Sequence, residues 1–313
     1  MTVTRVAAID CGTNSIRLLI ADLDPATGEI TDLDRRMVIN RLGQDVDRTG
    51  RLTPEALERT FAACREYAGL IAAHGVGPER IRLTATSASR DAANAGDFTA
   101  GVKDILGVEP EVITGEEEAH LSFLGATKEL TGTDLPTPYL VFDLGGGSTE
   151  FVLGAAEVQA ARSVNIGCVR MTERHFVGSE IPTPDQIARA RADIGAALDL
   201  AAETVPLDAA ATLVGVAGTV TTVAGIVLGL PAYDSGRIHH SRLSLEQVRE
   251  VSTRLLGATH AERAAIPVMH PGRVDVIAAG ALVLLEVMER TGAAELVVSE
   301  HDILDGIAWS IAP

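Results

Sequence analysis

The stretch VFDLGGGSTEFVLG, residues 141–154, places an acid, three glycines, a serine and a second acid within eight positions. The glycines leave backbone N–H groups with no Cβ to keep a ligand away. Successive N–H groups in such a turn form a concavity that binds anions. The turn is therefore predicted to bind phosphate through Gly145, Gly146, Gly147 and Ser148.

Two acids flank this turn. Asp143 precedes the glycines, and Glu150 lies two residues past Ser148, so strand alternation turns it back toward the turn. A carboxylate beside a phosphate is repelled unless a cation lies between them. Asp143 and Glu150 are therefore predicted magnesium ligands, directly or through water. The alternative is that Glu150 is an ordinary solvated strand residue.

The first half of the chain repeats this pattern in VAAIDCGTNSIRLLI, residues 6–20. Asp10 falls opposite Asp143, and Ser15 opposite Ser148, with one constant offset and no gaps. One such turn fits an ordinary tight turn, but two matched turns favour two phosphate-binding loops facing each other across a cleft. The repeat adds Asp10 to the predicted metal ligands and Ser15 to the predicted phosphate ligands.

A candidate general base lies in VITGEEEAHLSFL, residues 112–124. Thr114 and Glu117 fit the S/T-x-x-E capping box, which gives Glu117 a structural role at a helix start. Glu118 has no such role, and a helix N-terminus favours the ionised carboxylate that must accept a proton from water. The competing interpretation is an acidic first turn of the ordinary kind.

Two further turns follow short strand patterns. Arg90 follows the strand that ends in TATSASRDAANAGDF, residues 84–98, and strand ends of this kind carry ligands in α/β sheets. Gly218 and Thr219, in the strand-turn-helix pattern of residues 215–225, are predicted to meet a phosphate or a nucleotide. A solvated arginine at a helix start and a close-packed helix entry are the structural alternatives.

The order strand, strand, strand, helix, strand, helix occurs twice, which predicts an α/β fold of two duplicated domains, 1–130 and 131–300. The break falls in LTGTDLPTP, where glycine and prolines interrupt the periodicity. A C-terminal helix is expected within 301–313, and its composition allows packing on either domain. The repeated elements are expected at 3–9, 16–23, 33–41, 54–73 and 81–86, and again at 138–142, 149–154, 157–165, 183–203 and 211–218.

Composition limits the function classes. A formal net charge of −17 on 313 residues argues against nucleic-acid binding, which depends on clustered positive charge. Only two of the 26 basic residues are lysines, Lys103 and Lys128, so nearly all the positive charge is arginine, whose planar fork matches phosphate oxygens. The three cysteines show no metal-ligand spacing and are expected to be reduced core thiols. No signal peptide and no membrane span are recognised, which predicts a cytoplasmic protein.

Together these segments resemble the exopolyphosphatase/guanosine pentaphosphate phosphatase (Ppx/GppA) family, short two-domain form, of the actin-like ATPase superfamily with its ribonuclease H-like domains. Further matching blocks include RLGQDVDRTGRL, NIGCVRMTERHF, RVDVIAAGALVL and VSEHDILDGIAW. The resemblance implies release of terminal phosphate from inorganic polyphosphate or guanosine pentaphosphate, with Mg²⁺, by a homodimer. It assigns water activation to Glu118, phosphate contacts to Asn14, Arg90 and the Gly146–Ser148 loop, and the acidic positions to Asp143 and Glu150.

Two other functions fit the same loops. A kinase or ATPase of this superfamily would transfer phosphate between a nucleotide and an acceptor rather than to water. A non-catalytic sensor would bind an alarmone nucleotide without releasing phosphate. The complete set of acids favours the hydrolase, because a sensor has no need of a general base.

Overall fold

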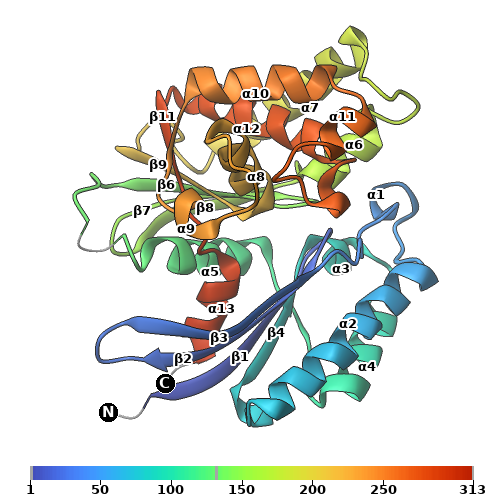
Figure 1. Cartoon of the computed structure of the whole chain (residues 1–313), viewed down its shortest axis with the longest axis vertical. Coiled ribbons are helices and arrows are strands. Elements are labelled where there is room, and N and C mark those ends of the chain that lie inside the picture. The colour runs from blue at the N-terminus through green and yellow to red at the C-terminus, as the bar shows by residue number, and fades with distance from the viewer. Residues whose placement is uncertain (1–2, 131–132, 312–313) are drawn as a thin grey trace. The chain divides into compact units, whose positions relative to one another are not determined.

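The computed structural model describes residues 3–130 and 133–311 (Figure 1). They form two compact units. The first contains the described residues up to Lys128 together with those from His301 onward, and the second spans Glu129–Glu300. The sequence predicted the division between residues 130 and 131, and the structure places it two residues earlier, between Lys128 and Glu129. The C-terminal helix belongs to the first unit. Within the described part of the chain, every helix is too short or too polar to cross a membrane.

The first unit is built on a five-stranded sheet with the order β3-β2-β1-β4-β5. Strands β1 (Thr4–Cys11), β2 (Ile16–Asp24) and β3 (Glu29–Val38) form an antiparallel meander, and β4 (Ile81–Ala85) and β5 (Glu111–Val112) join in parallel. The helices are α1 (Val46–Thr49), α2 (Pro54–Ala73), α3 (Ser87–Asp91), α4 (Ala95–Leu106), α5 (Gly115–Thr127) and α13 (Ile303–Ile311), with a 3₁₀ turn at Pro78–Arg80.

Side-chain alternation along β1 and β2 supplies two cores on the two faces of this sheet. On one face, residues such as Ile9 and Leu18 pack with Tyr67 of α2 and Phe98 of α4. On the other face, Leu19 and its neighbours pack with α5 and α13. Helix α13 packs on β1, β2 and β4 at this face, and α5 packs against α13.

The second unit has a six-stranded sheet with the order β10-β11-β9-β6-β7-β8. Its strands are β6 (Tyr139–Leu144), β7 (Thr149–Gly154), β8 (Val158–Val164), β9 (Thr212–Val216), β10 (Arg242–Ser244) and β11 (Glu295–Val298). Its helices are α6 (Cys168–His175), α7 (Pro184–Ala202), α8 (Ala217–Val227), α9 (Ser235–Ile238), α10 (Leu245–Gly257), α11 (His260–Ala264) and α12 (Ile277–Thr291), with a 3₁₀ turn at Pro271–Arg273. The apolar α12 is buried in the core.

The two units confirm the predicted duplication. From the meander outward, β3-β2-β1-β4-β5 corresponds to β8-β7-β6-β9-β11, and β10 is an added edge strand. The β1–β2 turn closes with a hydrogen bond from Gly12 N to Ser15 O (2.9 Å), and the β6–β7 turn with one from Gly145 N to Ser148 O (3.1 Å). All three cysteines are buried and unpaired, as expected of core thiols.

A buried charge network joins α13 to the meander. Arg17 lies directly opposite Asp10 in the β1–β2 register, contacts Asp10 Oδ2 through Nη2 (2.7 Å) and also pairs with Asp302. Burial raises the pKa of Asp10, although Arg17 acts in the opposite direction. Burial alone would also raise the pKa of Asp302, but the Arg17 guanidinium outweighs it and lowers that pKa. One cation therefore stabilises two buried carboxylates.

Replacing this cation tests the network. Arg17→Met leaves Asp10 and Asp302 buried without their shared partner, so the free energy of unfolding is expected to fall by about 3–5 kcal/mol. The control is Arg65→Met, which breaks an exposed pair with Glu58 on α2 and is expected to cost under about 1 kcal/mol. Urea unfolding measures both values, and equal losses in the two variants would contradict a buried network.

Candidate active site

The glycine turn between β6 and β7 directs its carbonyl groups toward the start of α6. Gly145 O accepts from Cys168 N (3.0 Å), and Gly146 O accepts from Val169 N (2.9 Å). Arg170 Nε donates to Gly147 O at 2.6 Å. The turn is thus held by its acceptors, on the side facing α6.

Three backbone N–H groups of the same turn, unlike its carbonyl groups, have no such partners among the described residues. The backbone N–H groups of Gly146, Gly147 and Ser148 make no hydrogen bond within the part of the chain that the structure describes. Consecutive free N–H groups in a turn form an anion-binding concavity. The geometry therefore suits the phosphate role predicted for this turn.

Gly167 and Arg170 support the turn, and neither was singled out from the sequence. A Cβ on Gly167 would overlap the Gly146 carbonyl, so α6 can approach the turn only with glycine at this position. Arg170 is nine-tenths buried. The available signal was the block NIGCVRMTERHF, a glycine before a helix that follows the third strand of the meander, but its partner is more than 20 residues away in the sequence.

The two acids beside the turn lie face to face. Asp143 and Glu150 are directly opposite each other in the β6–β7 register, and both are buried, Glu150 at 1% exposure. Ser163, opposite Glu150 on β8, donates to its Oε1 at 2.7 Å. The alternative of a solvated Glu150 is therefore wrong. Two adjacent buried carboxylates form the kind of oxygen donor set that Mg²⁺ binds.

Gly218 and Thr219 begin α8, next to the end of β6. The strand residue before them, Val216, pairs with Asp143. A Cβ on Gly218 would overlap the guanidinium of Arg273, whose Nη1 donates to Gly218 O (3.0 Å). This is a close-packed helix entry, and it brings an arginine that was not identified from the sequence to the predicted site. A phosphate contact at Gly218 and Thr219 stays a prediction.

In the first unit, Glu118 and Arg90 meet. Glu118 is buried at 7% exposure in the first turn of α5, and Arg90 Nη1 donates to its Oε2 at 3.2 Å and to Ile113 O at 3.0 Å. Thr114 caps the helix by accepting from Glu117 N (3.2 Å). The Glu117 side chain pairs with Arg82 (2.5 Å) instead of completing the predicted capping box. Glu118 is thus the buried acid of this helix start, paired with Arg90, whereas Glu117 is exposed and pairs with Arg82.

The β1–β2 turn is braced by its neighbours. Thr13 shares a hydrogen bond with Ser87 at the start of α3 (2.9 Å), and Asn14 O accepts from Arg41 N (3.0 Å). Asp10 Oδ1 and Asn14 Oδ1 are buried and have no hydrogen-bond partner in residues 3–130 and 133–311. Asn14 and Ser15 therefore lie in the turn and Asp10 near the end of β1 before it, at the end of the sheet where β4 leads into α3 and Arg90.

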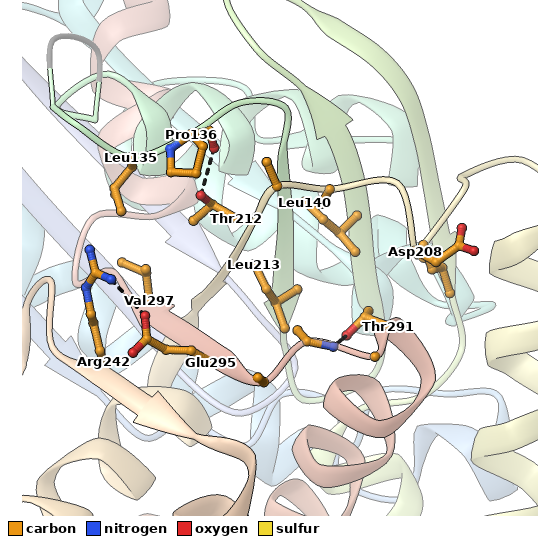
Figure 2. Close-up of a pocket in the computed structure, with 16 residues that line it drawn as sticks. Leu135, Pro136, Leu140, Asp208, Thr212, Leu213, Arg242, Thr291, Glu295 and Val297 are labelled. Carbon is orange, nitrogen blue, oxygen red and sulfur yellow. Dashed lines mark hydrogen bonds and ion pairs between the residues drawn. The ribbon is translucent and has the colours of Figure 1, made fainter.

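A cavity of about 340 Å³ in the second unit is not part of this site (Figure 2). It lies at the opposite, amino-terminal ends of the strands, against Leu140 of β6 and Leu213 of β9. Two of its charged side chains, Arg242 and Glu295, pair with each other at 2.8 Å. None of the residues predicted for phosphate or metal lines it.

Fold and turns together define a duplicated α/β protein in which the glycine turn of the second unit leaves backbone N–H groups without partners among the described residues. Comparison with known proteins then gives the particular class. The Ppx/GppA phosphatase family model matches residues 19–313, and the chain belongs to this family. The enzyme is thereby a phosphatase, and the family predicted from the sequence is confirmed.

Known proteins match this chain over its whole length. Over 323 aligned residues, covering all of both chains, it is 51% identical to Exopolyphosphatase 2 of Mycobacterium tuberculosis (strain ATCC 25618 / H37Rv). The crystal structure of an exopolyphosphatase-like protein is similar with a TM-score of 0.92, 46% identity and 98% coverage of each chain. The crystal structure of the Aquifex aeolicus Ppx/GppA family member is similar with a TM-score of 0.80 and 31% identity. The match covers 99% of this chain and 97% of the Aquifex chain.

Gly167 offers a test of the turn that leaves its N–H groups in place. Gly167→Ala is expected to displace the Gly146 carbonyl and to raise the KM for the phosphate substrate by roughly tenfold or more, a loss of about 1.4 kcal/mol in binding. The matched control is Gly195→Ala in α7, where an added Cβ meets nothing within 4 Å. Steady-state phosphate release measures both, and an unchanged KM in a folded Gly167→Ala protein would contradict the role of α6.

Proposed function

We propose that this protein is an exopolyphosphatase that releases terminal orthophosphate from inorganic polyphosphate. The observation that carries the proposal is the buried Glu118 carboxylate, held by Arg90 at a helix N-terminus. Membership in a phosphatase family and the name of the Mycobacterium tuberculosis relative support the reaction and the substrate class. Guanosine pentaphosphate is proposed as a second substrate, because it ends in the same type of phosphoanhydride.

In the proposed reaction Glu118 accepts a proton from water while the water oxygen attacks the terminal phosphorus in line. The bond from that phosphorus to the bridging oxygen breaks, and its electron pair stays on the shortened chain. Orthophosphate and a polyphosphate one unit shorter are the products. Glu118 then returns its proton to the leaving oxygen or to solvent.

Arg90 has donors to spare for this step. Only its Nη1 is engaged within the described part of the chain, and a guanidinium carries five N–H donors. The remaining donors can bind phosphoryl oxygens while Nη1 keeps Glu118 oriented. In the second unit, taken by itself, the free N–H groups of Gly146, Gly147 and Ser148 are proposed as uncharged donors for phosphate.

The acids fit a divalent cation, proposed here as Mg²⁺. Asp143 and Glu150 would hold it, because they are buried and directly opposed. In the first unit, the Oδ1 of Asp10, unpartnered among the described residues, is an oxygen of the same type, and its role as a metal ligand stays a prediction. A bound Mg²⁺ supplies positive charge that offsets the charge of the phosphate oxygens. Ser163 keeps the Glu150 carboxylate oriented toward this role.

Glu118→Gln is the direct test of the base. The amide preserves size but cannot accept the proton, so kcat is expected to fall by roughly 10²–10⁴ with little change in KM. The matched control is Glu116→Gln, which alters an exposed acid in the same helical turn and is expected to keep normal activity. Orthophosphate release with Mg²⁺ is the measurement, and near-normal kcat in Glu118→Gln would refute the assignment.

The same assay decides the substrate when short polyphosphate, long polyphosphate, guanosine pentaphosphate and ATP are compared. Release from polyphosphate without an acceptor supports the proposal. Turnover of ATP that requires an acceptor would instead indicate a kinase. Tight nucleotide binding with no release from any compound would indicate a sensor.

The metal site is testable without turnover. Asp143→Asn and Glu150→Gln are each expected to weaken Mg²⁺ binding, measured by calorimetry, by about tenfold or more, since each removes a charged ligand. Glu157→Gln, an exposed acid in the β7–β8 turn, is the control. Unchanged affinity in both site variants would place the metal elsewhere.

A further inference from the structure

Helices α5 and α13 of the first unit pack against each other (Figure 1). Two glycines bring their backbones into direct contact. A Cβ on Gly125 of α5 would overlap the carbonyl oxygen of Asp302. A Cβ on Gly306 of α13 would overlap the carbonyl oxygen of Leu121 on α5. The contact is reciprocal and backbone to backbone, so an added methyl at either position cannot be absorbed by a rotamer change.

This contact lies on the side of α5 that also carries Glu118. Residues three, four and seven apart share one face of a helix, which places Glu118, Leu121 and Gly125 in one row. Glu118 and Gly125 are separated by about two turns, roughly 10 Å along the axis. A displacement of α5 at Leu121 or Gly125 is therefore transmitted to Glu118 through a continuous helix.

Helix α13 is itself fixed to the sheet. Arg17 of β2 pairs with Asp302, and Arg35 of β3 pairs with Asp305 (2.5 Å). Asp302 also caps the helix by accepting from Leu304 N (3.0 Å). At the N-terminal end of α5, Glu118 accepts a hydrogen bond from Arg90. The carboxylate thus lies at the end of a chain of contacts that begins at the charged residues of β2 and β3.

We propose that Gly306 is a positioning residue for the general base, acting through α5, an inference that rests on the proposed function. Close approach of α13 sets the height of α5 above the sheet and so places the Glu118 carboxylate relative to Arg90 and the attacked phosphorus. Catalysis is sensitive to such placement, because a displacement near 1 Å costs about 100-fold in rate.

Gly306→Ala tests this with Gly96→Ala as the matched control. Gly96 lies in α4 of the same unit, where an added Cβ meets nothing within 4 Å. Both substitutions raise helix propensity, so a difference between them reports the helix contact. For Gly306→Ala we expect a roughly 10–100-fold lower kcat with KM within about twofold, and faster amide exchange in residues 115–121. Gly96→Ala should leave all three unchanged.

The assay is run well below the unfolding midpoints of both variants, because a merely structural role predicts a loss equal to the unfolded fraction. A loss of activity equal to the unfolded fraction overturns the proposal. A wild-type kcat in folded Gly306→Ala overturns it as well. If Gly306→Ala does not fold, the test uses Asp302→Asn instead. The amide keeps the cap on α13 but weakens the pair with Arg17 that fixes this helix. An unchanged kcat in Asp302→Asn overturns the proposal. If the wild-type protein releases no phosphate, the proposed function fails, while the exchange rates still decide whether α13 positions α5.

Discussion

The structure of the first unit depends on the Arg17 guanidinium, which lies between the buried carboxylates of Asp10 and Asp302. Arg17 stands opposite Asp10 as Glu150 stands opposite Asp143 in the duplicate, so the same two sheet positions hold an acid and a base in one unit and two acids in the other. Buried charge must be compensated in either case. The first unit does so with a side chain of its own, whereas the second presents a donor set suited to a divalent cation.

This difference gives the two halves different tasks in the proposed reaction. In the first unit the charge network fixes α13, and α13 packs on α5, the helix that carries Glu118. In the second unit the turn between β6 and β7 is held by its carbonyl groups, which leaves N–H groups for phosphate and two acids for a metal. A duplicated fold can specialise in this way because a single exchange at one register position, Arg17 against Glu150, changes the charge that faces the buried acid of each copy.

Much of this followed from local sequence. The two glycine turns, the strands around them and the long helices after Thr53 and Thr183 are encoded by short-range patterns of apolar alternation, glycine and capping residues. Glu118 was singled out because a predicted capping box assigned Glu117 to the helix start and left Glu118 without a structural role. Thr114 does cap the helix, but Glu117 pairs with Arg82 rather than completing the box, and the role of Glu118 as general base stays a prediction. Family membership was also readable, because its blocks keep their order along the chain.

The residues that support the site could not be found this way. Gly167, Arg170, Arg273 and Gly306 act on partners between about 20 and 185 positions away, and nothing in their own neighbourhood distinguishes them from ordinary helix starts and helix glycines. By itself the sequence determined where the glycine turns form and which acids lie at a helix start, since those properties reside in consecutive residues. Only the tertiary structure decided what holds them in place, because the close approach of two backbones and the pairing of buried charges exist only once distant segments have packed together.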